Sequence, residues 1–174
     1  MRIASPRTAL LVMPLLLIGT VSARPAEEPS GCDKFKWDIA RERAALTAPD
    51  RIALESGAAV ASAPSAAMTL ALRSLADAAL PTAPERAPRD GSFAGYAKFA
   101  GPPRAGLYAI SLSAGGWVDV IQDGHLLKPK AFSGARDCDG IRKTMKYELS
   151  AAPFVLQVSG TPQTTISIAI LPAE

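Results

Sequence analysis

Histidine is almost absent from this sequence of 174 residues, which contains one, and cysteine occurs only twice. Triads of the Ser-His-Asp or Cys-His kind need a histidine beside the nucleophile, so any such site would have to include His125. That residue directly follows an Asp-Gly pair, a hairpin turn where an exposed polar side chain is expected. Because the chain also lacks G-x-S-x-G, we predict no catalytic residue of these classes.

Ligand sets for metals are similarly scarce. The chain has no C-x-x-C pair, and two isolated cysteines with one histidine do not complete an ordinary zinc site. Asp137 and Asp139, followed by Gly140, look like the start of a calcium loop, but the next nine residues contain a single acid. A polar turn is the simpler interpretation. We predict no metal and no cofactor.

Aromatic residues make up only 6% of the chain, so most are expected in the core. Candidates for a ligand surface are therefore few. Trp117 follows a Gly-Gly pair where loops would gather, and Tyr96 is a second aromatic candidate. Arg142 and Lys146 lie on one face of a predicted strand, which is suited to an acidic polysaccharide or a solvated surface. The predicted ligand surface consists of these four residues.

Long apolar runs are missing except at the N-terminus. The basic stretch "MRIASPR" precedes the apolar "TALLVMPLLLIGTV", and "VSA" then supplies small residues ending at Ala23. This pattern predicts a signal peptide over residues 1–23, cleaved after Ala23, and the run is too short to span a bilayer comfortably. We expect a periplasmic or secreted protein that is not membrane-spanning once processed.

The charge of the chain is nearly balanced after this removal. Residues 1–23 contain two arginines and no acid, so 17 basic and 16 acidic residues remain. The cations are scattered among acids and form no stripe that would follow a phosphate backbone. We expect no nucleic-acid partner. The partner is otherwise unknown, and an envelope protein or a polysaccharide fits an exported chain.

An oxidising compartment also decides the expected state of the two cysteines. Two thiols in a mature exported domain most often pair, so we predict a disulfide between Cys32 and Cys138. Such a bond would close a loop of about 100 residues and stabilise the fold by roughly 4–5 kcal/mol in the chain-entropy model.

The remaining chain divides into three predicted parts. Residues 24–56 contain a charged arm and one amphipathic helix in the stretch "CDKFKWDIARERAALTAPD", with Asp33 as its N-cap and its end near Pro49. Residues 57–67 are rich in Ala, Ser and Pro and look like a linker. Residues 68–174 form the main domain, in which Leu80–Gly91, with three prolines, is a loop.

Short alternating segments with turn residues between them dominate the main domain. Tyr108, Ile110 and Leu112 share one strand face. One face of another strand is shared by a row of five residues: Ile141, Lys143, Met145, Tyr147 and Leu149. About seven such strands predict a mainly β fold, an antiparallel, jelly-roll-like β-sandwich with one N-terminal helix covering a sheet face or edge.

Two stretches, "AGLYAISLSAGGWVDVIQDG" and "IRKTMKYELSAAPFVLQVSGTPQTTISIAI", resemble the bacterial pre-peptidase C-terminal domain over about residues 106–171. That resemblance implies a small sandwich that aids secretion or contacts substrate surfaces. Motifs from "CDKFKW" to "LQVSG" also resemble a family of short exported proteobacterial proteins, some carrying a homogentisate 1,2-dioxygenase label. Iron-dependent ring cleavage of that kind needs two histidines, and this chain has one.

These observations favour a non-catalytic binding or structural module of the periplasm. The alternative is a periplasmic enzyme: a carboxylate-based glycan hydrolase using Asp119 with Asp123 or Glu148, or the dioxygenase that the family label implies. A third hypothesis is envelope association through the basic strand face, which predicts salt-sensitive retention on anionic glycans or vesicles.

Overall fold

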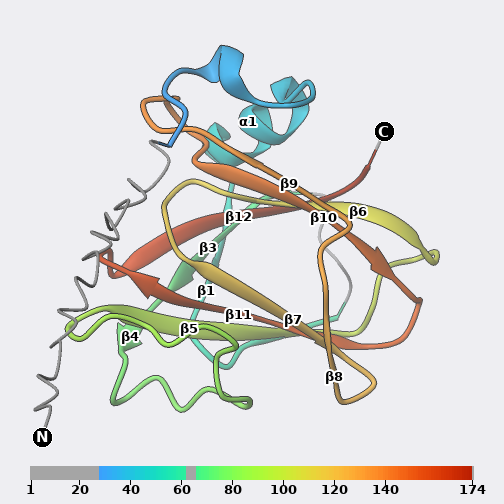
Figure 1. Cartoon of the computed structure of the whole chain (residues 1–174). Coiled ribbons are helices and arrows are strands. Elements are labelled where there is room, and N and C mark those ends of the chain that lie inside the picture. Colours follow the sequence, from blue (N-terminus) through green and yellow to red (C-terminus); the bar gives the residue numbers. More distant parts are fainter. Residues whose placement is uncertain (1–27, 62–65, 174) are drawn as a thin grey trace, which may run out of the picture.

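A computed structural model describes residues 28–61 and 66–173. The predicted signal peptide and its cleavage site after Ala23 lie outside the described residues. The described residues form twelve strands in two stacked sheets, which confirms the predicted β-sandwich (Figure 1). In the order of their pairing, sheet I contains β1 (Ile52–Leu54), β3 (Met68–Ala71), β12 (Thr165–Pro172), β6 (Gly106–Leu112), β10 (Lys143–Leu149) and β9 (Ala131–Gly134).

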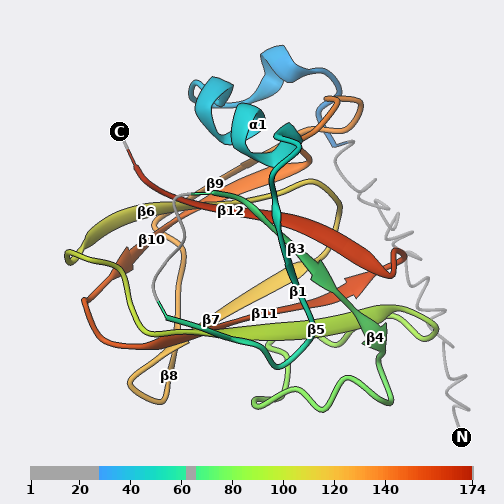
Figure 2. The ribbon, with the colours of Figure 1, turned by 180° about the vertical axis from the view of Figure 1, so that it is seen from behind.

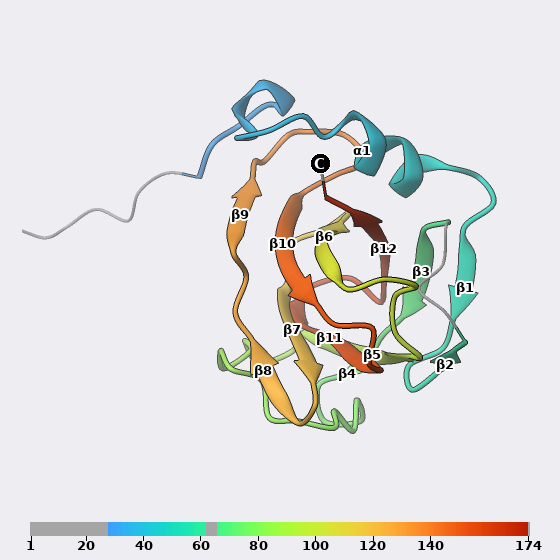
Figure 3. The ribbon, with the colours of Figure 1, turned by 90° about the vertical axis from the view of Figure 1, so that its right-hand side faces the viewer.

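Sheet II faces sheet I across the core (Figure 3). Its strands, again in order of pairing, are β2 (Ala59–Val60), β5 (Phe93–Phe99), β11 (Phe154–Thr161), β7 (Trp117–Gln122) and β8 (His125–Leu127), and β4 (Arg73–Ser74) pairs with β5. The sheets are mixed, because β1 pairs with β3 and β2 with β5 in parallel. The prediction of about seven antiparallel strands was therefore wrong for the short edge strands.

Strand alternation builds the core as predicted. Tyr108, Ile110 and Leu112 of β6 are buried between the sheets, opposite Val120 and Leu156 of sheet II. The inward row of β10 begins at Lys143, where the strand begins. Ile141 packs instead in a second apolar cluster, so its predicted place in that row was wrong.

The N-terminal segment differs from the single predicted helix. It forms the short 3-10 helix η1 (Cys32–Lys34) and, after an extended stretch, the α-helix α1 (Ala40–Thr47). Asp33 lies inside η1 and caps no helix. The prediction of one continuous helix was wrong because two polar contacts hold the intervening residues. Lys36 N donates to Ser133 Oγ at 2.9 Å, and Ala40 N donates to Asp38 Oδ1 at 2.9 Å.

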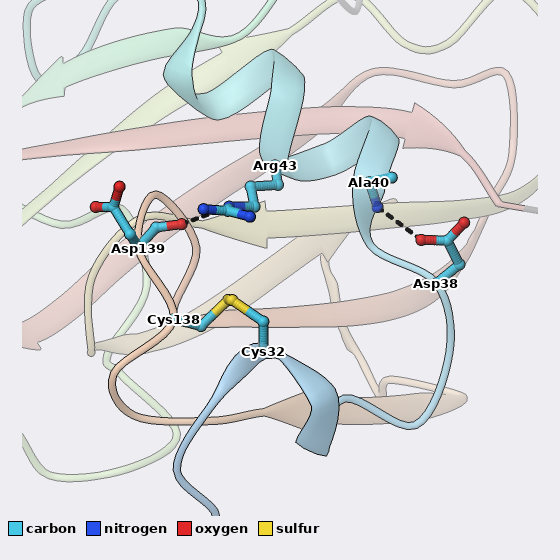
Figure 4. The surroundings of a disulfide bond; sticks show 6 residues. All are labelled: Cys32, Asp38, Ala40, Arg43, Cys138 and Asp139. Atoms are coloured by element: carbon cyan, nitrogen blue, oxygen red, sulfur yellow. Dashed lines mark hydrogen bonds between the residues drawn. A yellow bond between two sulfur atoms is a disulfide. The ribbon is translucent and has the colours of Figure 1, made fainter.

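A disulfide ties this segment to the sandwich (Figure 4). Cys32 and Cys138 form a bond of 2.04 Å across a separation of 106 residues, which confirms the predicted pairing. Beside it, Arg43 Nε donates to the carbonyl oxygen of Asp139 at 2.7 Å. The segment covers the outer face of sheet I, where its apolar side chains pack around Ile141 and Ala169. Such a bond is compatible with an oxidising location.

Residues earlier than the predicted domain boundary at 68 also belong to the sandwich. β1 and β2 are edge strands of the two sheets, so residues 57–67 are in part strand and the prediction of a plain linker was wrong there. No helix within residues 28–61 and 66–173 is both long enough and apolar enough to cross a membrane.

The loop predicted over residues 80–91 joins β4 to β5, and we call it the strap. It lies against the outer face of sheet II, on the side of the molecule away from α1 (Figures 1 and 2). The two outer faces of the sandwich are therefore covered by different segments, the N-terminal helices on sheet I and the strap on sheet II.

Candidate ligand-binding surface

A row of polar side chains crosses the outer face of sheet II. Gln157 of β11 is paired in register with Tyr96 of β5 on one side and with Asp119 of β7 on the other. The neighbours Leu156 and Val158 point into the core, so the alternation of the strand directs Gln157 outward. Three adjacent strands thus place a phenol, an amide and a carboxylate side by side.

Asp119 is the centre of this row. It is only 3% exposed, and its two oxygens accept hydrogen bonds from Trp117 Nε1 at 2.7 Å and from Gln157 Nε2 at 3.0 Å. The backbone N–H of Glu85, in the strap, donates to the same carboxylate at 3.4 Å. A buried carboxylate needs such donors to compensate for lost hydration, so Asp119 fixes both the tryptophan and the strap.

The strap makes three further contacts with sheet II. Gln157 Nε2 also donates to the carbonyl oxygen of Thr82 at 3.0 Å. Lys128, just after β8, forms an exposed ion pair with Glu85. The guanidinium of Arg86 lies 5.8 Å from the centre of the Trp117 ring, within cation–π range. Exposed ion pairs and cation–π contacts are individually weak, so the strap is held by several small contributions.

A second group of side chains consists of three cations whose charges interact, and we call it the cationic cluster: Lys143, Arg142 and Arg86. Lys143 is in the inward register of β10, and its Nζ donates to the carbonyl oxygen of Gly116. Burial lowers the pKa of Lys143 to about 8, with further lowering by the positive charges of Arg142 and Arg86 and a smaller opposing effect of Glu28. Among the described residues, no carboxylate lies within ion-pair distance of the Lys143 ammonium.

Phe132 completes the surroundings of this lysine. Its ring centre is 5.9 Å from Lys143 Nζ, and its side chain is 50% exposed on the edge strand β9. Only one other large apolar side chain of the described residues, Ile52, is exposed to a similar degree. Arg142 forms an ion pair with Glu28 of the N-terminal arm. A cation and an apolar ring are therefore presented together beside the turn that leads into β7.

The four residues of the predicted ligand surface do not form one surface. Trp117 and Tyr96 share the outer face of sheet II, as the pairing of both strands with β11 shows. Lys146 lies on the outer face of sheet I, with its Nζ 4.9 Å from the ring of Trp37. Arg142 precedes β10 and belongs to the cationic cluster. The two sheets therefore separate Lys146 from Trp117 and Tyr96, a separation that the strand pattern alone does not give.

Other members of the candidate surface are not among the four predicted ligand residues. Arg86 lies in a loop whose position depends on the fold, and Phe132 lies in a short edge strand that was not predicted. The sequence contains one feature that could have identified Lys143: it is the only cation in a row of strand positions that are otherwise apolar. Gln157 had another, because it is an amide within the apolar stretch "FVLQVSG".

Asp119 and Glu148, one carboxylate pair of the hydrolase alternative, are not brought together. Asp119 lies on the outer face of sheet II and Glu148 is exposed on the outer face of sheet I, so the two sheets separate them. Asp123 lies in the turn after β7, and the Asp119 carboxylate already accepts hydrogen bonds from Trp117 and Gln157.

The remaining candidates occupy turns. His125 is exposed and follows a tight turn in which Asp123 and Gly124 both have positive φ, as the Asp-Gly pair predicts. Asp137 accepts a hydrogen bond from Ser30 Oγ at 2.6 Å, in a polar turn. Nowhere in residues 28–61 and 66–173 do three or more His, Cys, Asp or Glu side chains gather in a way suited to a metal ion.

We compared the chain with protein-family models, curated proteins and solved structures, and none of them matches it. The resemblances to the pre-peptidase C-terminal domain and to a family of short exported proteins are therefore untested and stay predictions.

Proposed function

We propose that this protein is an exported, non-catalytic module that binds a polyanion of the cell envelope beside Lys143. Export is expected from the signal-peptide pattern of residues 1–23, and the Cys32–Cys138 bond is compatible with the oxidising compartment that export would reach. The mature chain is expected to begin at Arg24. Intact mass spectrometry of the protein isolated from a periplasmic fraction measures that start directly.

The observation that carries the proposal is the unpaired charge of Lys143. Keeping an ammonium largely buried beside two guanidinium groups opposes folding, because each positive charge disfavours the others and water is partly excluded. A folded protein retains such a group at a functional site more often than elsewhere. An incoming carboxylate or phosphate would supply the counter-charge that the described residues do not.

The neighbouring side chains support a polymer rather than a single small ion. Arg86 and Arg142 add positive charge near Lys143, while Phe132 and Trp117 add ring surfaces. The acidic polysaccharide considered from the sequence fits this description, now centred on Lys143 rather than on Lys146.

The test is binding of purified, oxidised protein (residues 24–174) to two polyanions of matched charge, oligogalacturonate and polyglutamate, by calorimetry. We expect binding that weakens as salt is raised, because exposed charges are screened over roughly 10 Å at 0.1 M ionic strength. Lys143→Met should reduce the affinity for both polymers. Exposed Lys130→Met, which removes an equal charge, should have a much smaller effect. Failure of both polymers to bind would reject the proposal.

A further inference from the structure

The face of sheet II beneath the strap contains buried polar atoms that lack partners. Among the described residues, three buried side-chain nitrogen or oxygen atoms make no hydrogen bond, and two of them, Gln157 Oε1 and Ser159 Oγ, lie on β11 two residues apart. Gln157 is completely buried and Ser159 is 1% exposed. Buried polar groups are nearly always hydrogen-bonded, so a pair of exceptions on one strand face requires an explanation.

Both residues lie under the strap, next to Trp117. Ser159 is the register partner of Trp117, whose ring is covered by Arg86, and Gln157 is the register partner of Asp119. Pro88 passes close to Gly160, because a Cβ placed on that glycine would be 3.9 Å from the proline. The strap therefore covers β11 from Gln157 to Gly160.

We propose that these residues form a saccharide subsite, which a sugar ring enters when the strap lifts and Arg86 leaves the face of Trp117. The indole ring offers an apolar plate against which the C–H face of a sugar can pack. Hydroxyl groups both donate and accept hydrogen bonds, so they can donate to Gln157 Oε1 and bond with Ser159 Oγ. The inference rests on the proposed polyanion binding and adds that the polyanion is a polysaccharide.

The contacts of the strap fit a segment that can be displaced. Its ion pair, Glu85 with Lys128, is exposed, and the bond from the Glu85 N–H to Asp119 is long at 3.4 Å. Asp119 keeps its bonds to Trp117 Nε1 and Gln157 Nε2 when the strap moves, because both partners belong to sheet II. The floor of the subsite thus remains ordered while its cover opens.

The charged groups of the cationic cluster lie beside the same tryptophan. Lys143 Nζ bonds to the carbonyl of Gly116, the residue that precedes Trp117. A uronic acid unit carries hydroxyl groups and a carboxylate on one ring. Its ring on Trp117 would bring the carboxylate, or that of the next unit, toward Lys143. A polypeptide polyanion has no such ring and would use the cationic cluster alone.

Ser159→Ala tests the subsite, because the hydroxyl it removes has no partner in the free protein. Stability should be unchanged or slightly higher, while affinity for oligogalacturonate should fall roughly three- to tenfold, the effect of one lost hydrogen bond. Affinity for polyglutamate should not change. Thr164→Ala, which removes an exposed hydroxyl from the same hairpin outside the strap, is the matched control and should leave both affinities unchanged.

Lys128→Ala tests whether the strap must lift. Loss of its pair with Glu85 should strengthen oligogalacturonate binding about twofold, the size expected for an exposed ion pair, although the protein loses a positive charge. Polyglutamate binding should stay equal or weaken.

Three results would overturn the subsite. The first is that polyglutamate binds and oligogalacturonate does not, and the second is that Ser159→Ala changes neither affinity. The third is that Ser159→Ala lowers the stability of the free protein, which would mean that the hydroxyl has a structural role such as holding a water molecule. In each of these cases polyglutamate binding that requires Lys143 would leave the proposed function standing.

Discussion

Replacing Lys143 by methionine should make the protein more stable and less able to bind. The pKa of this lysine is lowered from 10.5 to about 8, a difference that corresponds to about 3 kcal/mol of opposition to folding when the side chain is charged. Methionine fills a similar volume without the charge. Its loss of the hydrogen bond to Gly116 offsets part of the gain, so we expect a net stabilisation of about 1–2 kcal/mol at pH 7.

The pH dependence of this effect has a definite sign. Below about pH 8 the lysine is protonated in both the folded and the unfolded chain, so the full penalty is present. Between about pH 8 and 10.5 the folded protein loses the proton first, and the free energy of unfolding therefore rises with pH. The stability advantage of Lys143→Met should shrink by about 3 kcal/mol across this range, and the lost hydrogen bond does not affect that change.

Urea denaturation of both proteins at several pH values from 7 to 10.5 measures this difference. Lys130→Met is the control, since Lys130 is exposed and its replacement empties no buried position. A Lys143→Met advantage that stays constant with pH, or a variant that is less stable than the parent at pH 7, would refute the reasoning. Polyanion binding should weaken over the same pH range, because the neutral amine no longer attracts a carboxylate.

Three other substitutions test the fold and the strap. Cys32→Ser should lower the free energy of unfolding by about 4–5 kcal/mol, measured by urea denaturation without reductant, because the bond closes a loop across 106 residues. A decrease of less than 1 kcal/mol would contradict a stabilising role of the disulfide. Asp119→Ala should cost about 2–4 kcal/mol by removing the acceptor of Trp117 Nε1 and one of the two acceptors of Gln157 Nε2, and should speed proteolysis within the strap. An unchanged rate of proteolysis within the strap would show that Asp119 does not hold the strap in place. Gly101→Ala should lower the free energy of unfolding by about 2 kcal/mol or more, because φ at this position is +112° and a Cβ would lie 2.4 Å from the carbonyl oxygen of Ala151. A variant that melts at the same temperature as the wild type would contradict this.

The sequence predicts those parts of the fold that depend on local pattern. Alternation identifies the inward face of β6, and the Asp-Gly pair identifies the β7–β8 turn, because both reflect interactions between residues close in the chain. The break in the predicted helix could not be found in this way. It depends on Lys36 bonding to Ser133, a residue 97 positions away that lies on another strand.

The candidate surface was predictable only in part for the same reason. Trp117 was identified as an aromatic residue at a turn, but its partners come from β7, β11 and the strap, which only the sheet pairing brings together. Two-residue strands such as β2 carry too little pattern to be recognised, and they exist because a neighbouring strand offers free hydrogen-bonding groups.

The last strand that the structure describes occupies an interior place in sheet I. β12 lies between β3 and β6, so until residues 165–172 are available these two strands have a gap between them. A nascent chain halted before that point can build neither a continuous sheet nor the apolar interior behind it. This ordering postpones completion of sheet I until residues 165–172 have been synthesised.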